Sequence, residues 1–148
     1  MRKFALIGGR RILRSLSDFG IKADFIPSQD FFDMRLHNIT CDTLIFGVSP
    51  TLKKYKIDWL PELGKFENFT CNKLIFLSSA AVYGLSSKVK PFSESNIPSP
   101  TTQYGFEKVE YEKQLAKVAR LKKWNFLNLR ISGIYNDINN CHNSSSLI

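Results

Sequence analysis

Three short apolar runs, at residues 4–7, 43–48 and 74–77, constrain the fold of this chain more than any other feature. None of them alternates apolar with polar side chains, so each run is typical of a strand that is buried on both faces. Helical spacing follows the first run, from Ile12 to Phe19, and Gly20 ends it. We therefore expect an α/β domain of three layers with a mostly parallel sheet of about five or six strands.

The composition is that of one globular domain. The chain has 148 residues, of which 43% are hydrophobic and 23% are charged, so it is long enough to bury a core and too short for two ordinary domains. No apolar run approaches the ~20 residues of a membrane span. The apolar run behind Met1 is too short for a signal peptide. We therefore expect no membrane partner and a cytoplasmic location.

The net charge of +8 comes from basic residues that are dispersed along the chain. Nucleic-acid binding favours a cluster of such residues on one surface, so we expect no nucleic-acid partner. The cysteines and histidines are scattered as well, at Cys41, Cys71, Cys141, His37 and His142. Their spacing fits no metal site, and we expect free thiols and no bound metal.

Candidate catalytic residues follow the third apolar run. That run ends in Ser79, and the helical pattern that follows begins with Tyr104 and Lys108. Tyr104 and Lys108 are four residues apart and share one helix face. An ammonium so close favours the phenolate and lowers the tyrosine pKa from about 10, so that Tyr104 would exchange a proton with a substrate hydroxyl. With Ser79 as a hydrogen-bond donor to the same oxygen, the set suits alcohol oxidation by hydride transfer to a nicotinamide.

Further motif elements follow one another in order across residues 74–135. They are Ser78-Ser79-Ala80-Ala81-Val82-Tyr83-Gly84, Pro91, Glu94, Pro100, Tyr104-Gly105-Phe106-Glu107-Lys108 and Glu112. This string resembles the middle of an extended short-chain dehydrogenase/reductase, and more narrowly the NAD-dependent epimerase/dehydratase family that acts on nucleotide-sugars. By motif position, Ser79 matches the active-site Ser/Thr and Tyr104 the general acid/base. Lys108 matches the residue that holds the nicotinamide ribose and lowers the tyrosine pKa.

The resemblance also implies a domain organisation and partners. Residues 1–135 would form a Rossmann-like NAD(P)-binding domain, and the polar residues 136–148 a disordered tail. Enzymes that this chain resembles are about twice as long and continue into a substrate-binding lobe, which this sequence lacks. A nucleotide-sugar would be the substrate, and the long helix that begins near Tyr104 would be the face of a homodimer.

The first turn departs from the family pattern. Gly8 and Gly9 follow the first apolar run, where a dinucleotide-binding fold aims backbone N–H groups at the cofactor pyrophosphate. The family carries three glycines at a spacing of three, and Arg11 and Arg14 occupy the second and third of these places here. A side chain at Arg11 stands where bare backbone approaches the pyrophosphate.

Two interpretations of the arginines remain open. Arg10, Arg11 and Arg14 would contact a phosphate directly, and a ribose 2′-phosphate in particular, which favours NADP. Alternatively the cofactor site is degenerate and these side chains are solvated. No clear acid follows the strand predicted at residues 21–26, where Pro27-Ser28 stands instead, so the usual partner of the NAD ribose is missing and NADP is again weakly favoured over NAD.

The remaining elements follow from local patterns. A helix is predicted from Thr101 or Thr102 to about Lys123, since Thr is a good N-cap and one core-facing stripe recurs through it. A strand is expected at residues 125–130, and a short helix or a loop at 30–38. Residues 52–69 have helical spacing, so we expect a helix that packs on one face of the sheet, although Pro61 and Gly64 weaken this prediction.

Two functions are compatible with these residues. The first is an NAD(P)-dependent epimerase, dehydratase or reductase of nucleotide-sugars, in which Ser79, Tyr104 and Lys108 are catalytic and Gly8, Gly9, Arg11 and Lys108 bind the cofactor. The second is a non-catalytic, degenerate relative that acts as a nucleotide-binding or interaction module.

Overall fold

The structure of the chain is a computed structural model, and it describes residues 2–8, 16–33, 38–48, 60–84 and 92–132. Gly9, the three arginines of the first turn, most of the predicted first helix, Pro91 and the predicted tail lie outside the described residues. The elements are β1 (Arg2–Ile7), β2 (Asp24–Ile26), α2 (Ser28–Phe32), β3 (Ile39–Phe46), the 3-10 helix η1 (Leu63–Phe66), β4 (Phe69–Thr70), β5 (Lys73–Ser79), the 3-10 helix η2 (Ala80–Tyr83), α3 (Gln103–Lys122) and β6 (Asn125–Ile131).

The strands form one parallel sheet, as the apolar runs predict. Its order is β2-β1-β3-β5-β6, and the short strand β4 pairs with β3. Ile7 of β1 is opposite Phe46 of β3, and Phe46 is opposite Phe76 of β5. Because all pairs are parallel, the carboxyl ends of β1, β3 and β5 meet at one edge of the sheet.

The strand order contains a switch point between β1 and β3. From β1 the chain first adds β2 on one side and then returns to the other side for β3. In open parallel sheets, ligands bind in the crevice at the carboxyl ends of the strands on either side of such a point. Beyond β2, the described residues supply no further strand, whereas the classic dinucleotide-binding sheet has one there. The fold is therefore Rossmann-like, with one side of the sheet abbreviated.

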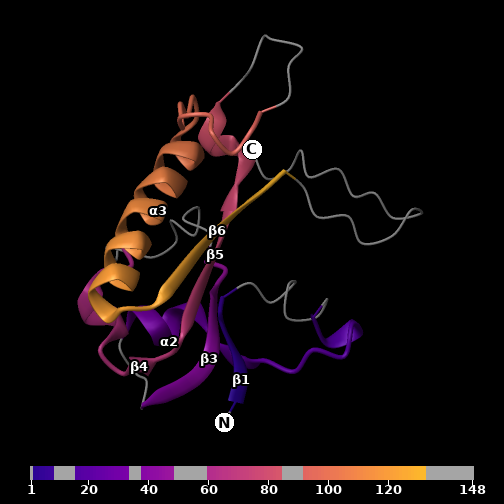
Figure 1. Cartoon of the computed structure of the whole chain (residues 1–148), viewed down its shortest axis with the longest axis vertical. Helices are drawn as coiled ribbons and strands as arrows, with labels where there is room; N and C mark the ends of the chain where they lie inside the picture. Colours follow the sequence, from indigo (N-terminus) through magenta and orange to yellow (C-terminus); the bar gives the residue numbers. More distant parts are fainter. Residues whose placement is uncertain (1, 9–15, 34–37, 49–59, 85–91, 133–148) are drawn as a thin grey trace.

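The core lies between the sheet and the face covered by α3, η1 and α2 (Figure 1). Its centre is a cluster of aromatic rings, in which the Phe46 ring lies 5.4 Å from Phe31, 6.1 Å from Phe66 and 6.0 Å from Phe76, between centroids. Phe31, Phe46, Phe66 and Phe76 are fully buried. Burial of four large rings contributes roughly 1.5–3 kcal/mol each and holds α2 and η1 on the sheet.

The segment predicted as a helix at residues 52–69 is different where it is described. Residues 60–62 are irregular, η1 is a single 3-10 turn, and Phe69–Thr70 pairs with β3 as β4. Pro61 has no N–H to donate to a helix, and Gly64 adds backbone entropy, so a longer helix is disfavoured here. Phe66 of this segment is fully buried in the core.

Helix α3 is the long helix that the sequence predicts. The Thr102 hydroxyl caps it by accepting a hydrogen bond from the Gly105 N–H at 3.1 Å, and Lys123 ends it in the left-handed conformation with φ 59°. The stripe expected to face the core is buried at Lys108, Tyr111, Leu115 and Val118. Within the described ranges, no helix is both long and apolar enough to cross a membrane.

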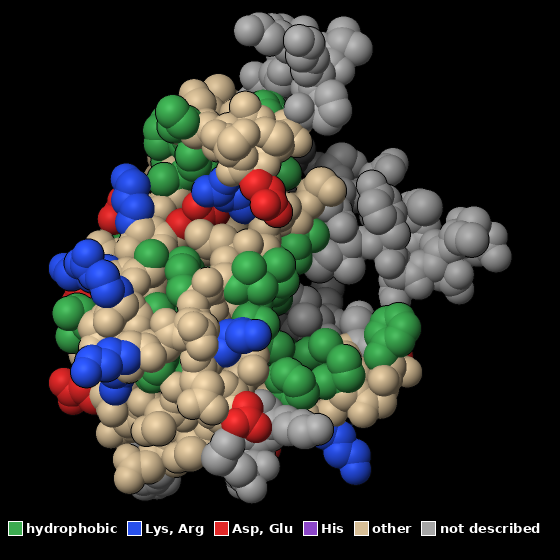
Figure 2. Space-filling view, in the orientation of Figure 1, with side chains coloured by type: hydrophobic (Ala, Val, Ile, Leu, Met, Phe, Trp, Pro, Cys, Tyr) green, Lys and Arg blue, Asp and Glu red, His purple; other side chains and the backbone are tan. Residues whose placement is uncertain are grey.

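The opposite face of β6 is less well covered. Leu127 and Leu129 are exposed, whereas Phe126, which points the other way, packs against the core. Figure 2 shows hydrophobic side chains over the strands in the middle of the face that it presents, and Lys and Arg side chains along the edge where α3 lies in Figure 1. Among the described residues, the sheet is thus covered more completely by α3 than on its other side.

The start of α3 lies against η2, and a glycine makes this close approach possible. A Cβ at Gly105 would lie 2.5 Å from the Ala81 carbonyl oxygen and 2.9 Å from Pro100 Cβ. Neither neighbour is the free end of a flexible side chain. The backbone of α3 therefore packs directly on η2 only because residue 105 has no side chain.

We predict that Gly105→Ala lowers the free energy of unfolding by about 1–3 kcal/mol, because the added methyl group forces α3 away from η2. Urea unfolding followed by circular dichroism measures this change. Gly64→Ala is the matched control, since nothing lies within 4 Å of its added Cβ. Equal stability of the two variants would contradict the close approach.

Candidate active site

Ser79 and Tyr104 come from different elements and meet at the carboxyl edge of the sheet. Ser79 ends β5 and caps η2, where its hydroxyl accepts a hydrogen bond from the Ala81 N–H at 3.2 Å. Tyr104 lies in the first turn of α3, and the Ser79 side chain lies close enough to lower the pKa of its hydroxyl. The approach of Gly105 to Ala81 brings these two hydroxyls together. The structure therefore joins the predicted serine and the predicted tyrosine.

Lys108 completes the group from the next turn of α3. Its ammonium donates hydrogen bonds to the carbonyl oxygens of Leu77, at 2.9 Å, and Val48, at 3.3 Å. Nζ also lies 4.7 Å from the centroid of the Phe76 ring and 5.7 Å from that of Tyr104. With 3% of its surface exposed, Lys108 is a buried cation held on the ends of β3 and β5.

Burial shifts the two titratable groups in opposite directions. It lowers the pKa of Lys108 to about 8, and the Glu112 carboxylate opposes this shift. It raises the pKa of Tyr104, and the hydrogen bond with Ser79 opposes that shift. The expected lowering of the Tyr104 pKa by Lys108 is therefore wrong for this conformation. The reason is that the ammonium is directed at two backbone carbonyls, and that burial disfavours the phenolate.

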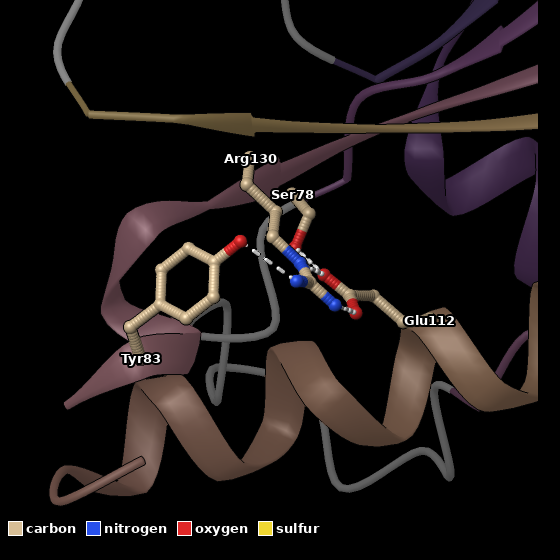
Figure 3. A network of polar contacts seen from close by, with 4 residues as sticks. All are labelled: Ser78, Tyr83, Glu112 and Arg130. Atoms are coloured by element: carbon tan, nitrogen blue, oxygen red, sulfur yellow. Dashed lines mark hydrogen bonds and ion pairs between the residues drawn. The ribbon is translucent and has the colours of Figure 1, made fainter. Parts of the chain in front are cut away.

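A polar network that sequence reasoning did not assign to the site lies beside it (Figure 3). The Glu112 carboxylate accepts a hydrogen bond from the Ser78 hydroxyl at 2.6 Å, and from Arg130 Nε and Nη2 at 3.0 and 2.8 Å. Arg130 Nη1 donates to the Tyr83 hydroxyl at 2.9 Å. The hydrogen bonds with Glu112 raise the pKa of Arg130. The network connects β5, η2, α3 and β6.

Two sequence features pointed to this network. Glu112 belongs to the motif string and stands four residues after Lys108, on the same helix face. Arg130 is the one charged side chain in β6. A charge within a strand that pairs with a buried strand needs a partner, and the nearest carboxylate on the facing helix is Glu112.

The residues at the switch point fit a dinucleotide. Gly8 follows β1 with φ 70°, and its N–H donates to the Ile26 carbonyl oxygen at 2.9 Å. A Cβ at Gly8 would lie 2.7 Å from Ser28 Oγ and 3.1 Å from Val48 Cγ2, so this turn requires glycine. Val48, whose carbonyl holds Lys108, lies at the same place. The described part of the turn is therefore packed closely against Ser28 and Val48, and it has no room for a side chain at residue 8. Gly9 and Arg11 lie outside the described residues.

Cys41 and Cys71 are free thiols, as expected, and both are buried. Their side chains are hydrogen-bonded to each other, which lowers the pKa of Cys41. The part of the chain that the structure describes contains no group of three or more potential metal ligands. Cys141 and both histidines lie outside that part.

Comparison with solved structures places the fold among nucleotide-sugar enzymes. The UDP-N-acetylglucosamine 4-epimerase from Bacillus cereus is 15% identical with a TM-score of 0.62, over 93% of this chain and 56% of that one. The enzyme of the same name from Methanobrevibacter ruminantium M1, in complex with UDP-N-acetylmuramic acid, is 19% identical with a TM-score of 0.59, over 95% and 59%. MoeE5 in complex with UDP-glucose and NAD is 15% identical with a TM-score of 0.56, over 85% and 52%. This chain thus spans a little over half the length of these structures.

A parallel sheet with this switch point defines a Rossmann-like α/β domain, and Ser79, Tyr104 and Lys108 lie at its carboxyl edge. The sequence profile of the NAD dependent epimerase/dehydratase family matches residues 62–146. The chain belongs to this family. A search of curated proteins gives no match.

The burial of the Lys108 charge can be tested by measuring how the stability of the chain depends on pH. Its pKa in the folded chain, about 8, is below the ordinary 10.5, so between these values the unfolded chain binds more protons and stability rises with pH. Below about pH 8 the buried charge opposes folding in full. We predict that Lys108→Met increases the free energy of unfolding near neutral pH by about 2–3 kcal/mol, and that this gain declines towards pH 10.5.

Urea unfolding at several pH values measures this difference. Lys113→Met is the matched control, because the Lys113 side chain is 68% exposed on the same helix. It should show no comparable gain at any pH. A Lys108→Met variant that is less stable than the parent chain near neutral pH would contradict the cost of burying this charge.

Proposed function

We propose that this chain is the dinucleotide-binding part of an NAD(P)-dependent epimerase, dehydratase or reductase that acts on nucleotide-sugars. The observation that carries the proposal is the grouping of Ser79, Tyr104 and Lys108 at the carboxyl edge next to the switch point, with the Lys108 ammonium held by the strand-end carbonyls 5.7 Å from the Tyr104 ring. The family is NAD dependent, which supports a nicotinamide dinucleotide as the cofactor. The names of the similar solved structures support a UDP-sugar as the substrate class.

Each residue has a role in this proposal. Tyr104 exchanges a proton with the substrate hydroxyl, and Ser79 donates a hydrogen bond to the same oxygen as it changes to a carbonyl. Lys108 stabilises the phenolate form of Tyr104 and binds ribose hydroxyls. The turn at Gly8 and Gly9 would bring backbone N–H groups to the pyrophosphate, while the Gly8 N–H itself is donated to the Ile26 carbonyl oxygen. When bound, the nicotinamide supplies the hydride acceptor.

The choice between NAD and NADP depends on the turn after β1 and the end of β2. Ser28 follows β2, where an NAD-binding domain places an acid, and Arg11 stands in the glycine turn. A neutral hydroxyl after β2, and an arginine in the sequence of the turn, favour a ribose 2′-phosphate, because a carboxylate would repel it. We therefore propose NADP as the preferred cofactor.

A second candidate is a nucleotide-binding or interaction module without turnover. It is favoured by the arginines in place of two glycines. In a nucleotide-binding module Gly8 and Lys108 would still contact a dinucleotide, and Tyr104 would exchange no proton with a substrate. The cytoplasmic location and the homodimer stay predictions from the sequence.

Cofactor binding separates these possibilities. We expect titration with NADPH and with NADH, followed by nicotinamide fluorescence, to give micromolar dissociation constants, on the order of ordinary cofactor sites, with NADPH tighter. Arg11→Gln should remove most of the preference for NADPH. A folded chain that binds neither nucleotide would contradict the enzyme and leave only an interaction module, and tighter NADH would contradict the role of Arg11.

For the catalytic group, we predict that Tyr104→Phe lowers turnover of UDP-N-acetylglucosamine or UDP-glucose by about 10²–10⁴-fold with little change in cofactor binding, since only the proton-exchanging hydroxyl is lost. Tyr111→Phe is the control, because it removes a hydroxyl from the same helix within the core. Turnover in which the two variants are equally affected would contradict the role of Tyr104. Cofactor binding with no turnover in the parent chain would support the module instead.

A further inference from the structure

Lys108 and Glu112 would be expected to pair with each other. They stand four residues apart on the buried face of α3, and both are nearly inaccessible, with exposed fractions of 3% and 6%. Opposite charges at this spacing form ion pairs on helices, and buried charges need a partner. In the structure, however, each group is engaged elsewhere.

The partners of Glu112 account for this arrangement. Arg130 approaches as a fork, with Nε 3.0 Å from Oε1 and Nη2 2.8 Å from Oε2, and the Ser78 hydroxyl adds a third hydrogen bond to Oε1 at 2.6 Å. A guanidinium matches a carboxylate in this two-point geometry, which an ammonium does not. Both oxygens of Glu112 are therefore occupied from β5 and β6 (Figure 3).

The partners of Lys108 lie on the other side. Its ammonium donates to the carbonyl oxygens of Leu77 and Val48 and lies over the Phe76 ring. The titratable side chains of α3 that face it are Tyr104 and Glu112. Backbone carbonyls of β5 and of the end of β3 face it from the sheet. Of these groups only Glu112 is a carboxylate, so it is the one competitor for the ammonium.

We propose that Arg130 is a positioning residue that acts on Lys108 through Glu112. By occupying both carboxylate oxygens, Arg130 prevents Glu112 from capturing the ammonium, which remains on the strand ends beside Tyr104. Without that guanidinium, Glu112 would be a buried carboxylate without a cation, and Lys108 is the cation one helical turn away. The ammonium would turn from the sheet edge towards the helix and leave Tyr104.

The test reads the titration of Lys108 directly, in the full chain, by NMR of lysine labelled with 13C at Cε. The resonance of Lys108 is identified by its loss in Lys108→Met. In Arg130→Gln the amide still donates a hydrogen bond to Glu112 but the counter-charge is gone, so we expect the titration midpoint of Lys108 to rise by about one pH unit or more. Arg130→Lys keeps the charge, and the midpoint should stay within a few tenths of a unit of the parent value.

A midpoint unchanged in Arg130→Gln, or shifted equally in both variants, would overturn the proposal. Glu112→Gln provides a test that leaves no unpaired carboxylate, in case Arg130→Gln does not fold. Because Arg130 already neutralises Glu112, we expect Glu112→Gln to lower the Lys108 midpoint by less than about half a unit. A fall of a full unit would mean that Glu112 holds Lys108 despite Arg130, and would also overturn it.

The double variant separates positioning from simple structural support. If Arg130 acts through the charge of Glu112, Glu112→Gln combined with Arg130→Gln should return the Lys108 midpoint to near the parent value, because the competitor is gone. If Arg130 only supports the fold, the double variant should be at least as perturbed as Arg130→Gln. These readouts need no turnover, so they stand or fall apart from the function proposed above.

The consequence for activity rests on that proposed function. Arg130→Gln should lower kcat more than it raises KM, and should move the pH profile of kcat, with recovery in the double variant. Loss of kcat with an unchanged Lys108 midpoint would place the effect of Arg130 on a contact other than Lys108 and overturn the proposal. Absence of turnover in the parent chain would count against the proposed function and leave the NMR test unaffected.

Discussion

The arrangement of the described chain around the site depends on the Glu112 carboxylate. It stands on α3, accepts hydrogen bonds from Ser78 of β5 and Arg130 of β6, and reaches Tyr83 at the end of η2 through the same guanidinium. A buried ion pair is costly to desolvate and adds little net stability, but removal of one partner costs about 3–5 kcal/mol. Its value here is geometric, because it fixes the register of α3 against the strand that ends in Ser79.

A second constraint acts at the amino end of α3, on either side of Tyr104. The Thr102 cap and the absence of a side chain at Gly105 let the first turn lie on Ala81. With the helix held at Gly105 and again at Glu112, both Tyr104 and Lys108 have fixed positions relative to the ends of the strands. The proximity of Tyr104 and Ser79 thus follows from a backbone packing contact at Gly105 and an ion-pair network at Glu112, neither of which involves the reacting groups.

Much of this architecture could be predicted because it rests on local patterns. Continuous apolar runs indicate a parallel sheet, and the spacing of Tyr104, Lys108 and the core-facing stripe gives both the helix and the grouping of the site. The predicted direction of the Tyr104 pKa shift was wrong. That shift depends on burial and on the carbonyls of Leu77 and Val48, which other elements supply. The ion pair of Glu112 with Arg130 was missed for the same reason. Arg130 comes after α3 in the sequence, and only the pairing of β6 with β5 brings it to Glu112.

The opposing shifts at Tyr104 and Lys108 decide the charge state of the resting site. Burial makes Lys108 the first of the two to lose its proton as pH rises, near pH 8, while Tyr104 is still a neutral phenol. The charge that would stabilise a phenolate is therefore lost before the phenolate forms. In the proposed function, Tyr104 starts as a proton donor to a carbonyl oxygen. It becomes a base only when a hydrogen bond from Ser79, or reorientation of Lys108 towards its hydroxyl, offsets the cost of burying the negative charge. Retaining the ammonium at the strand ends, rather than on Glu112, keeps that reorientation within reach.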